Sequence, residues 1–316
     1  MKFNNQKKVV IITISYNVPE YTIKCINSIL TSTYDDFTIL LIDNASEQIN
    51  ISKLKANLPN DKRINLILQD KNIGYVGGVN KGLAEGSKYN PEYFMIMNND
   101  TIIAPSAINN LVETCYQYNN KAIVTGKVYN YNTNIIQYVG DQLIDENYLK
   151  YKRIGSGELD SGQFDHISER DMIDDIFWLF PKKLYDDIGG YSEYFWFNGE
   201  SADFALRAKN KDYKMVFTPD AKLWHKGSIS IGGRIKNPIK SFWIIQSKIL
   251  LRKKHLTNFY FARFILKVFY ETNPPLESKG SFVLYQIDDD SEFLTMTRAE
   301  NGGWRIDVPK EIPVGL

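Results

Sequence analysis

Short apolar runs alternate with helical segments through the first hundred residues, and each run ends in a polar cluster. The four runs that we predict as strands cover residues 9–14, 37–42, 64–68 and 93–97. Such alternation predicts an α/β fold, with a mixed, mostly parallel sheet flanked by helices. Open α/β sheets bind ligands at the carboxyl ends of their strands, where the loops surround a crevice. We therefore expect the functional residues at this edge.

The composition fits a full-sized folded domain. The chain has 316 residues, of which 43% are hydrophobic and 13% aromatic, so disorder is excluded as its main state. The two cysteines, Cys25 and Cys115, suggest neither a disulfide framework nor a zinc site, which indicates a reducing compartment. No run reaches the ~18–20 apolar residues that span a bilayer. We expect a cytoplasmic protein, soluble or peripheral on the inner face of the cell membrane.

Two of the polar clusters have both a structural and a functional interpretation. Asn98-Asn99-Asp100 either caps the helix predicted from residue 105 or supplies oxygen ligands to Mg²⁺ or Mn²⁺, whose coordination the substrate's phosphates would complete. Asp43, followed by Asn44, either satisfies backbone groups in a turn or accepts hydrogen bonds from a nucleobase or ribose. Each cluster taken alone leaves the choice open.

A glycine-rich run over residues 72–82 would let the backbone approach a ligand closely. It contains four glycines and two asparagines. The glycines do not have the spacing of a dinucleotide-binding fingerprint, and the run lacks the Gly-Lys-Ser/Thr of a P-loop. A nicotinamide or ATP site therefore has no support from a motif.

Opposite charges gather in two blocks toward the C-terminus. Residues 221–270 hold eleven Lys and Arg, nine aromatics and no acid, whereas residues 271–316 hold nine acids and four basic residues. A solvated helical face would mix both signs, and a nucleic-acid site lacks any recognisable module. We favour a pair of helices on an anionic membrane surface, in which basic residues face headgroups and apolar residues insert. The basic residues are Lys248, Arg252, Lys253 and Lys254, and the apolar ones Trp243, Ile244, Leu250 and Leu251.

The ordered set of motifs resembles a known family. Ser15-Tyr16-Asn17, Asp43-Asn44-Ala45-Ser46, the glycine run and Asn98-Asn99-Asp100 resemble the nucleotide-sugar half of family 2 glycosyltransferases with the GT-A fold. Gly189-Gly190, Glu200 to Arg207 and Trp224-His225 resemble the acceptor half of the rhamnosyl- and galactofuranosyl-transferase branch. The resemblance covers residues 8–260.

The resemblance implies inverting transfer of a sugar from a nucleotide-diphosphate donor to an acceptor hydroxyl, in surface polysaccharide or glycoconjugate biosynthesis. The acceptor would be a carbohydrate or a lipid-linked molecule, and the cofactor Mn²⁺ or Mg²⁺. Asp100 and His225 would then ligate the metal. The donor would be bound by Ser15, Asn17, Asp43, Gly78, Asn80 and Asn98.

The chain departs from the family pattern at the general base. Relatives have a carboxylate at the position of Ser201, and a serine hydroxyl is too weak a base near neutral pH. Glu200 is the first substitute, and Asp203 is either a second substitute or a structural ion pair with Arg207. A local change of register and weakened catalysis are further alternatives. So is a non-catalytic nucleotide-sugar-binding or scaffold protein.

These observations divide the chain into three parts. We expect a GT-A glycosyltransferase domain over residues 1–227, a basic aromatic helical region over 228–273 and an acidic C-terminal appendage over 274–316. No nucleic-acid partner is expected. Association of identical chains stays open, and so does the role of the appendage.

Overall fold

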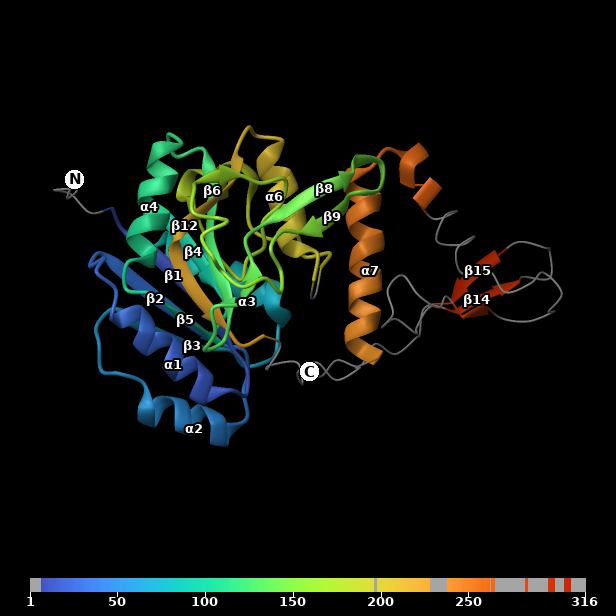
Figure 1. Cartoon of the computed structure of the whole chain (residues 1–316). Helices are drawn as coiled ribbons and strands as arrows, with labels where there is room; N and C mark the ends of the chain where they lie inside the picture. Colours follow the sequence, from blue (N-terminus) through green and yellow to red (C-terminus); the bar gives the residue numbers. More distant parts are fainter. Residues whose placement is uncertain are drawn as a thin grey trace.

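The first half of the molecule alternates strands and helices, as the apolar runs predicted (Figure 1). The structure, a computed structural model, describes residues 7–195, 198–227, 238–261, 263–264, 282–283, 295–298 and 304–307. The four predicted strands are confirmed. The elements are β1 (Val9–Ser15), α1 (Pro19–Leu30), β2 (Phe37–Asp43), α2 (Gln48–Asn57), β3 (Ile64–Leu68), α3 (Gly74–Ser87) and β4 (Tyr93–Met97).

The second half adds the remaining strands of the sheet, a hairpin and further helices. They are β5 (Thr101–Ile103), α4 (Ala107–Gln117), β6 (Ala122–Asn130), β7 (Ile136–Tyr138), β8 (Asp141–Asp145), the 3₁₀ helix η1 (Glu146–Tyr148), β9 (Lys150–Arg153), β10 (Ser168–Glu169), β11 (Phe177–Pro181), α5 (Lys182–Ile188), α6 (Glu200–Lys209), β12 (Lys214–His225) and α7 (Pro238–His255). A separate antiparallel sheet contains β13 (Phe282–Val283), β14 (Thr295–Arg298) and β15 (Trp304–Asp307).

The main sheet is mixed and has ten described strands. Its order is β10-β12-β6-β11-β4-β1-β2-β3, with β5 paired to β12 and β7 to β6. β1 is parallel to β2 and β4, and β2 is parallel to β3. β11 runs antiparallel between β4 and β6. Because β11 is reversed, the segment that precedes it lies at the carboxyl end of β4, beside the predicted site.

The strands at the centre are apolar throughout because helices cover both faces of the sheet. Along β1, Val9 and Ile11 belong to the apolar cluster that contains α1 and α4 residues, while Val10 and Ile12 pack with α3 on the other face. Cys25 is buried in the first cluster, and burial raises the pKa of its thiol to about 12. Buried neutral thiols of this kind serve packing.

The glycine run forms the start of α3, and its glycines serve packing against the sheet. A Cβ on Gly78 would lie 3.1 Å from the Ile14 side chain, and one on Gly82 would lie 2.4 Å from Ile12. These glycines stand four residues apart, so they share the helix face that touches β1. The missing side chain of Gly78 faces β1 and lets the helix come close, and its approach to a nucleotide stays a prediction.

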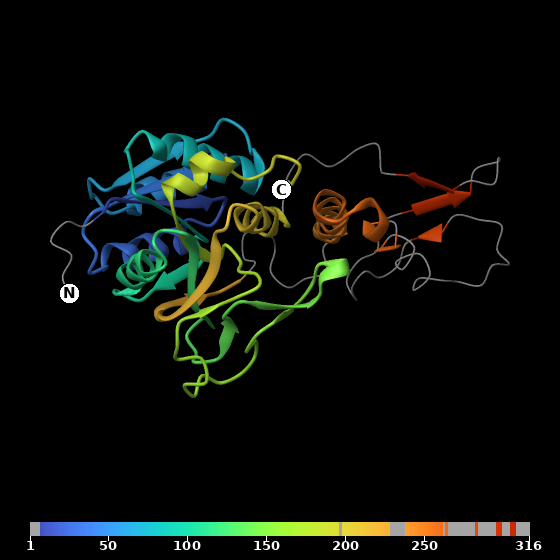
Figure 2. The ribbon, with the colours of Figure 1, turned by 90° about the horizontal axis from the view of Figure 1, so that it is seen from above.

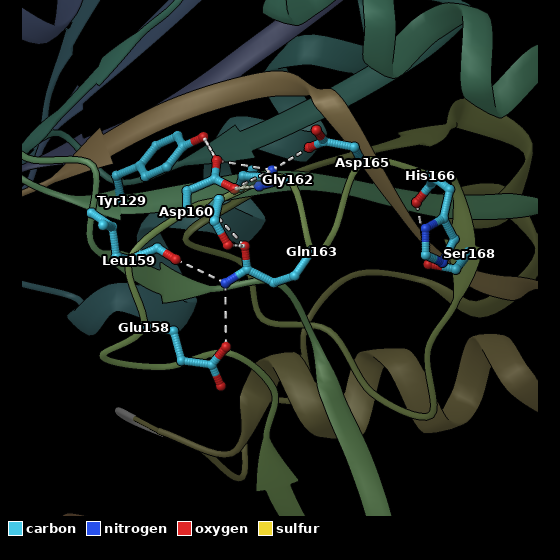
Figure 3. Close-up of polar contacts among 11 residues, drawn as sticks. Tyr129, Glu158, Leu159, Asp160, Gly162, Gln163, Asp165, His166 and Ser168 are labelled. Carbon is cyan, nitrogen blue, oxygen red and sulfur yellow. Dashed lines mark hydrogen bonds and ion pairs between the residues drawn. The ribbon is translucent and has the colours of Figure 1, made fainter.

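A buried lysine fastens the irregular segment between β9 and β10 onto β6. The side chain of Lys127 is 1% exposed, and its ammonium donates to Asp160 at 2.9 Å and to Asp165 at 2.8 Å. Figure 3 shows Asp160 also accepting a hydrogen bond from Tyr129, and Gln163 bonded to Glu158 and Leu159 nearby. The ion pairs explain how a segment with little regular structure keeps one conformation.

Helix α7 lies beside α6 and the tip of the β8–β9 hairpin (Figures 1 and 2). Lys254 Nζ and His255 Nε2 each lie 2.7 Å from an Asp203 carboxylate oxygen on α6. Arg252 Nε donates to the Tyr148 carbonyl at 2.8 Å, and Leu251 is buried. The membrane insertion predicted for Leu251 is wrong, because this side chain is buried against protein. Arg252 and Lys254 contact protein here, and their role at a membrane surface stays a prediction.

Several predictions fall outside the described residues. They concern the side chain of Trp243, residues 228–237 and most of residues 265–316. The three-part division of the chain therefore stays a prediction. In the described part of the chain, no helix combines the length and apolar character needed to cross a membrane.

Candidate functional site

The polar clusters that follow the strands meet at one edge of the sheet. Ser15 and Asp43 are paired across β1 and β2, at the last residue of each strand. The Ser15 hydroxyl lies 3.0 Å from that of Thr22, which also accepts a hydrogen bond from the Asn99 amide at 2.8 Å. The cluster after β4 is thereby tied to the end of β1, as the sequence predicted for ligand-binding loops.

Asp43 organises the turn after β2. Its two carboxylate oxygens accept from the backbone N–H and the hydroxyl of Ser46, at 2.9 and 2.7 Å. Ser46 Oγ in turn accepts from the Asn17 N–H, and the Asn17 amide oxygen accepts from the Glu47 N–H. These contacts join the loops after β1 and β2 and give Asp43 and Asn17 a structural role. Their contact with a nucleotide stays a prediction.

Asn80 holds a turn of the acceptor half. Its amide oxygen accepts from the Tyr191 N–H at 2.7 Å, and its amide nitrogen donates to the Tyr191 carbonyl at 2.9 Å. Because both ends of the amide are used by one backbone residue, Asn80 positions this turn, and its predicted role in binding the nucleotide stays a prediction. Arg207 supports the same turn by donating to the Gly190 carbonyl at 2.7 Å.

Asp100 and His225, the predicted metal ligands, are brought together by the pairing of β12 with β5. The register places His225 opposite Thr101, the residue after Asp100. His225 Nε2 lies 3.1 Å from Asp100 Oδ1, and the Asn98 side-chain amide lies 3.4 Å from the same nitrogen. Both side chains are buried, with Asp100 7% and His225 8% exposed.

Gln137 determines which nitrogen of His225 faces Asp100. The Gln137 amide nitrogen donates to Asn130 Oδ1 at 3.3 Å, which directs the amide oxygen toward His225 Nδ1, 2.7 Å away. This network assigns the ring proton to Nδ1 and leaves a lone pair on Nε2. A lone pair and a carboxylate 3.1 Å apart repel each other unless a proton or a cation lies between them.

These surroundings fit a divalent cation. Among the described residues, no group of three or more His, Cys, Asp or Glu side chains could hold a metal ion. Two protein ligands are nevertheless enough for Mg²⁺ or Mn²⁺ when water and substrate phosphates fill the remaining positions. An imidazole nitrogen and a carboxylate are suitable donors for Mn²⁺.

Lys226 adds a positive charge next to this pair, and the sequence analysis missed it. Its backbone N–H donates to the Asp100 carbonyl at 3.1 Å. Its ammonium donates to the Tyr21 hydroxyl at 2.8 Å and lies 4.3 Å from the centre of that ring. The position directly after His225 was the only signal for it in the sequence.

A second group of acids stands at the same strand edge, before β11 and at the start of α6. The Asn98 N–H donates to the Ile176 carbonyl at 3.0 Å, which fixes the preceding Asp174-Asp175 beside the site. Asp175 Oδ2 accepts from the hydroxyls of Tyr75 at 2.8 Å and Tyr191 at 2.6 Å. Burial, with the charge of Asp174, raises the pKa of Asp175 to about 7. The sequence analysis missed both aspartates because they belong to no motif.

The two predicted catalytic carboxylates have opposite surroundings. Glu200 is buried at the first residue of α6, and its Oε2 is without a hydrogen-bond partner among the described residues. Burial, and then the charge of Asp175, raises its pKa well above the usual range. Burial would also raise the pKa of Asp203, but hydrogen bonds from His255 and Lys254 and the charge of Arg207 lower it to about 2.

A solved structure with a similar fold indicates the fold class of this protein. The structure is similar to a solved mannosyltransferase, PcManGT from Pyrobaculum calidifontis in complex with GDP-Man and Mn²⁺. The TM-score is 0.56 at 12% identity, and the match covers 83% of this chain and 69% of that one. The molecule therefore has the GT-A fold, as predicted.

A match in sequence shows the family to which the chain belongs. The sequence pattern of glycosyl transferase family 2 matches residues 10–177, just over half of the chain, and the chain belongs to this family. GlyG, a glycosyltransferase of Streptococcus pneumoniae, is 26% identical over 179 residues, covering 55% of this chain and 56% of GlyG. An uncharacterized glycosyltransferase of Haemophilus influenzae is 33% identical over 102 residues, covering 32% of this chain and 31% of that protein. The match thus spans about half or less of these relatives.

Proposed function

We propose that this chain transfers a sugar from a nucleotide-diphosphate donor to an acceptor hydroxyl with the help of a divalent cation. Family membership supports glycosyl transfer. The observation that carries the metal-dependent donor site is the buried pair of Asp100 and His225, whose facing atoms lie 3.1 Å apart. The similar mannosyltransferase was solved with GDP-Man and Mn²⁺, which is consistent with a donor and metal of this kind.

Asp100 and His225 would hold the cation, which when bound stabilises the charge that develops on the leaving diphosphate. Lys226 would add its positive charge at the same end. Its ammonium is oriented by a phenol and a ring face, so it can approach an incoming phosphate without first leaving an acidic partner among the described contacts.

The acceptor hydroxyl must lose its proton as it attacks the anomeric carbon, which becomes oxocarbenium-like. A carboxylate on the far side of the sugar from the diphosphate can take this proton, and the resulting single displacement inverts the anomeric configuration. The acids before β11 and at the start of α6 lie at the same strand edge as the metal pair, which supports this arrangement.

The finer assignments are part of the same proposal. We place the reaction in the assembly of a surface polysaccharide or glycoconjugate on the cytoplasmic side, with a rhamnosyl-, galactofuranosyl- or hexosyl-type transfer and a carbohydrate or lipid-linked acceptor. The resemblance of the Glu200–Arg207 and Trp224-His225 motifs supports this branch. A peripheral membrane contact through the region after residue 227 belongs to the proposal as well.

A panel of UDP-, GDP- and dTDP-sugars tests the function directly. The purified chain is incubated with each donor and Mn²⁺, with and without simple sugar acceptors, and release of nucleoside diphosphate is measured. We expect release from at least one donor, and its abolition by EDTA. A protein that binds a donor but releases nothing would instead be the non-catalytic nucleotide-sugar-binding protein suggested by Ser201.

A further inference from the structure

A transferase of the proposed kind needs a carboxylate that is ionised near neutral pH and reachable by the acceptor. Four described acids stand at the end of the site formed by β11 and α6: Asp174, Asp175, Glu200 and Asp203. Their surroundings differ enough to separate them. The inference below rests on the proposed function and names the residue that would act as its base.

Asp203 is ionised but enclosed. Its side chain is 0% exposed, and its oxygens are occupied by Arg207 at 2.8 Å and by Lys254 and His255 at 2.7 Å each. A carboxylate paired with Arg207 and Lys254 and in hydrogen-bond contact with His255 holds no proton at neutral pH, and an acceptor hydroxyl could reach it only by displacing α7. Its contacts make it the residue that docks α7 on α6.

Asp175 and Glu200 are both buried, and the charge of Asp175 acts on Glu200. They are 7% and 5% exposed, and burial raises the pKa of both. Asp175 already accepts hydrogen bonds from two tyrosines. A neutral Glu200 avoids the repulsion that a second buried charge beside Asp175 would cause. Glu200 is therefore better suited to stay protonated than to act as a general base.

Asp174, the remaining acid, is both hydrogen-bonded and partly exposed. Its side chain is 30% exposed. Oδ1 accepts from the Asp175 N–H at 2.9 Å and from the Ser201 hydroxyl at 3.2 Å, and Oδ2 accepts from Arg153 at 3.0 Å. Three donors fix the orientation of this carboxylate, and its partial exposure leaves it within reach of an acceptor hydroxyl.

We propose that Asp174 is the general base of the transfer and that Ser201 is a positioning residue that orients it. Asp174 takes the proton of the acceptor hydroxyl while that oxygen forms its bond to the anomeric carbon. The bond from the anomeric carbon to the diphosphate breaks, and its electron pair leaves with the nucleoside diphosphate. The proton then passes from Asp174 to solvent.

The geometry also explains why a serine can stand at position 201. Its hydroxyl is 3.2 Å from Asp174 Oδ1 and supplies a hydrogen bond. An aspartate at 201 would bring a second carboxylate into the space beside Asp174, where two like charges repel. A base on the segment before β11 and a base on α6 are therefore alternative ways of placing one carboxylate at the same point.

The central test is Asp174→Asn, measured on the donor from the panel that the wild type turns over fastest. We expect kcat to fall by about 100-fold or more, the usual contribution of a general base. Calorimetric titration of the corresponding nucleoside diphosphate with Mn²⁺ should show affinity within about threefold of wild type, because uniform binding is not affected. Asp186→Asn, an exposed acid on α5 paired with Lys182, is the matched control and should leave both quantities unchanged.

A rescue experiment separates a base from a structural residue. The double variant Asp174→Asn, Ser201→Asp returns a carboxylate to the same point from α6, and we expect it to recover at least about tenfold in kcat over Asp174→Asn. Ser201→Ala alone removes one hydrogen bond to the ionised base. It should move the acid limb of the pH–rate profile upward with little change in nucleotide affinity.

The outcomes separate the base assignment from the proposed function. Asp174→Asn with more than about a third of wild-type kcat would overturn the assignment, as would a wild type that binds Mn²⁺ and nucleotide yet turns over no donor. A double variant as inactive as Asp174→Asn would overturn the role given to Ser201. A wild type that binds no nucleoside diphosphate would overturn the proposed function itself, before any substitution is made.

Discussion

Gln137 shows how one residue outside every motif can define the chemistry of a predicted ligand. It directs the Nε2 lone pair of His225 toward Asp100 through a single hydrogen bond of 2.7 Å. The sequence indicated Asp100 and His225 through their motifs, but a hydrogen-bond partner 88 residues away leaves no pattern in the chain.

Substitution of Gln137 should therefore weaken metal binding, although Gln137 is not itself a proposed metal ligand. We expect Gln137→Leu to lower Mn²⁺ affinity by about tenfold or more, because the ring of His225 loses the partner that fixes its tautomer. Electron paramagnetic resonance of free Mn²⁺ in the presence of nucleoside diphosphate measures this affinity. Gln142→Leu, on the β8–β9 hairpin, serves as the control, and equal affinities in the two variants would contradict the role of Gln137.

Asp203 gives a stability prediction with a defined pH window. Its pKa of about 2 lies below the ordinary value of 3.8, so its ionised form stabilises the fold above pH 4, and this stabilisation is lost as the pH falls toward 2. The shift corresponds to about 2 kcal/mol. Asp203→Asn leaves Arg207 and Lys254 without their acid, and we expect it to lower the free energy of unfolding by about 3 kcal/mol at pH 7.

Urea unfolding of wild type and Asp203→Asn at pH 7 and pH 3 measures both effects. The difference between the two proteins should shrink at pH 3, where wild-type Asp203 begins to lose its charge. A difference that is the same at both pH values would show that the ion pairs do not stabilise the docking of α7.

Among the elements, α3 shows most clearly where sequence patterns were insufficient. The glycine run predicts a ligand-binding loop because glycine permits close approach, and in the structure Gly78 and Gly82 approach β1 closely. Both interpretations use the same property of glycine. Only the helix register, which places Gly78 and Gly82 on the face toward the sheet, distinguishes them.

This packing predicts a specific sensitivity of α3. Gly82→Ala would place a methyl 2.4 Å from Ile12, and we expect it to lower the free energy of unfolding by about 2 kcal/mol through overpacking. Gly77→Ala is the control, since the nearest atoms to its new methyl belong to the Ile73 side chain at 3.0 to 3.3 Å and not to the sheet, and it should change stability by less than about 1 kcal/mol. Chemical denaturation that finds the two variants equally stable would contradict the packing role.

Other elements could be predicted from the sequence where neighbouring residues determine them, and less well where distant residues do. Strands β1 to β4 follow continuous apolar runs and were located to within a residue or two. β12 is less local, because Pro219 and Asp220 interrupt its apolar pattern while the strand continues through an irregularity between Thr218 and Lys222. The site residues Asp174 and Asp175 depend on the reversal of β11, which sequence alone does not determine.

At the scale of the whole molecule, the strand edge brings together groups from both halves of the chain. Asp100 follows β4 and His225 ends β12, while the acids at the opposite side of the site come from the segment before β11 and from α6. Helix α7 is fastened to α6 through Asp203, so this helix is part of the same folded unit as the site.

The central claim is that Asp100 and His225 bind nucleoside diphosphate through a divalent cation. Calorimetric titration of UDP, GDP and dTDP into the wild type and Asp100→Asn, each with and without Mn²⁺, tests it most directly. We expect at least one nucleotide to bind the wild type with Mn²⁺, and binding to weaken by about tenfold or more when either Mn²⁺ or the Asp100 carboxylate is removed. Equal affinity under all four conditions, or no binding of any nucleotide, would contradict the claim.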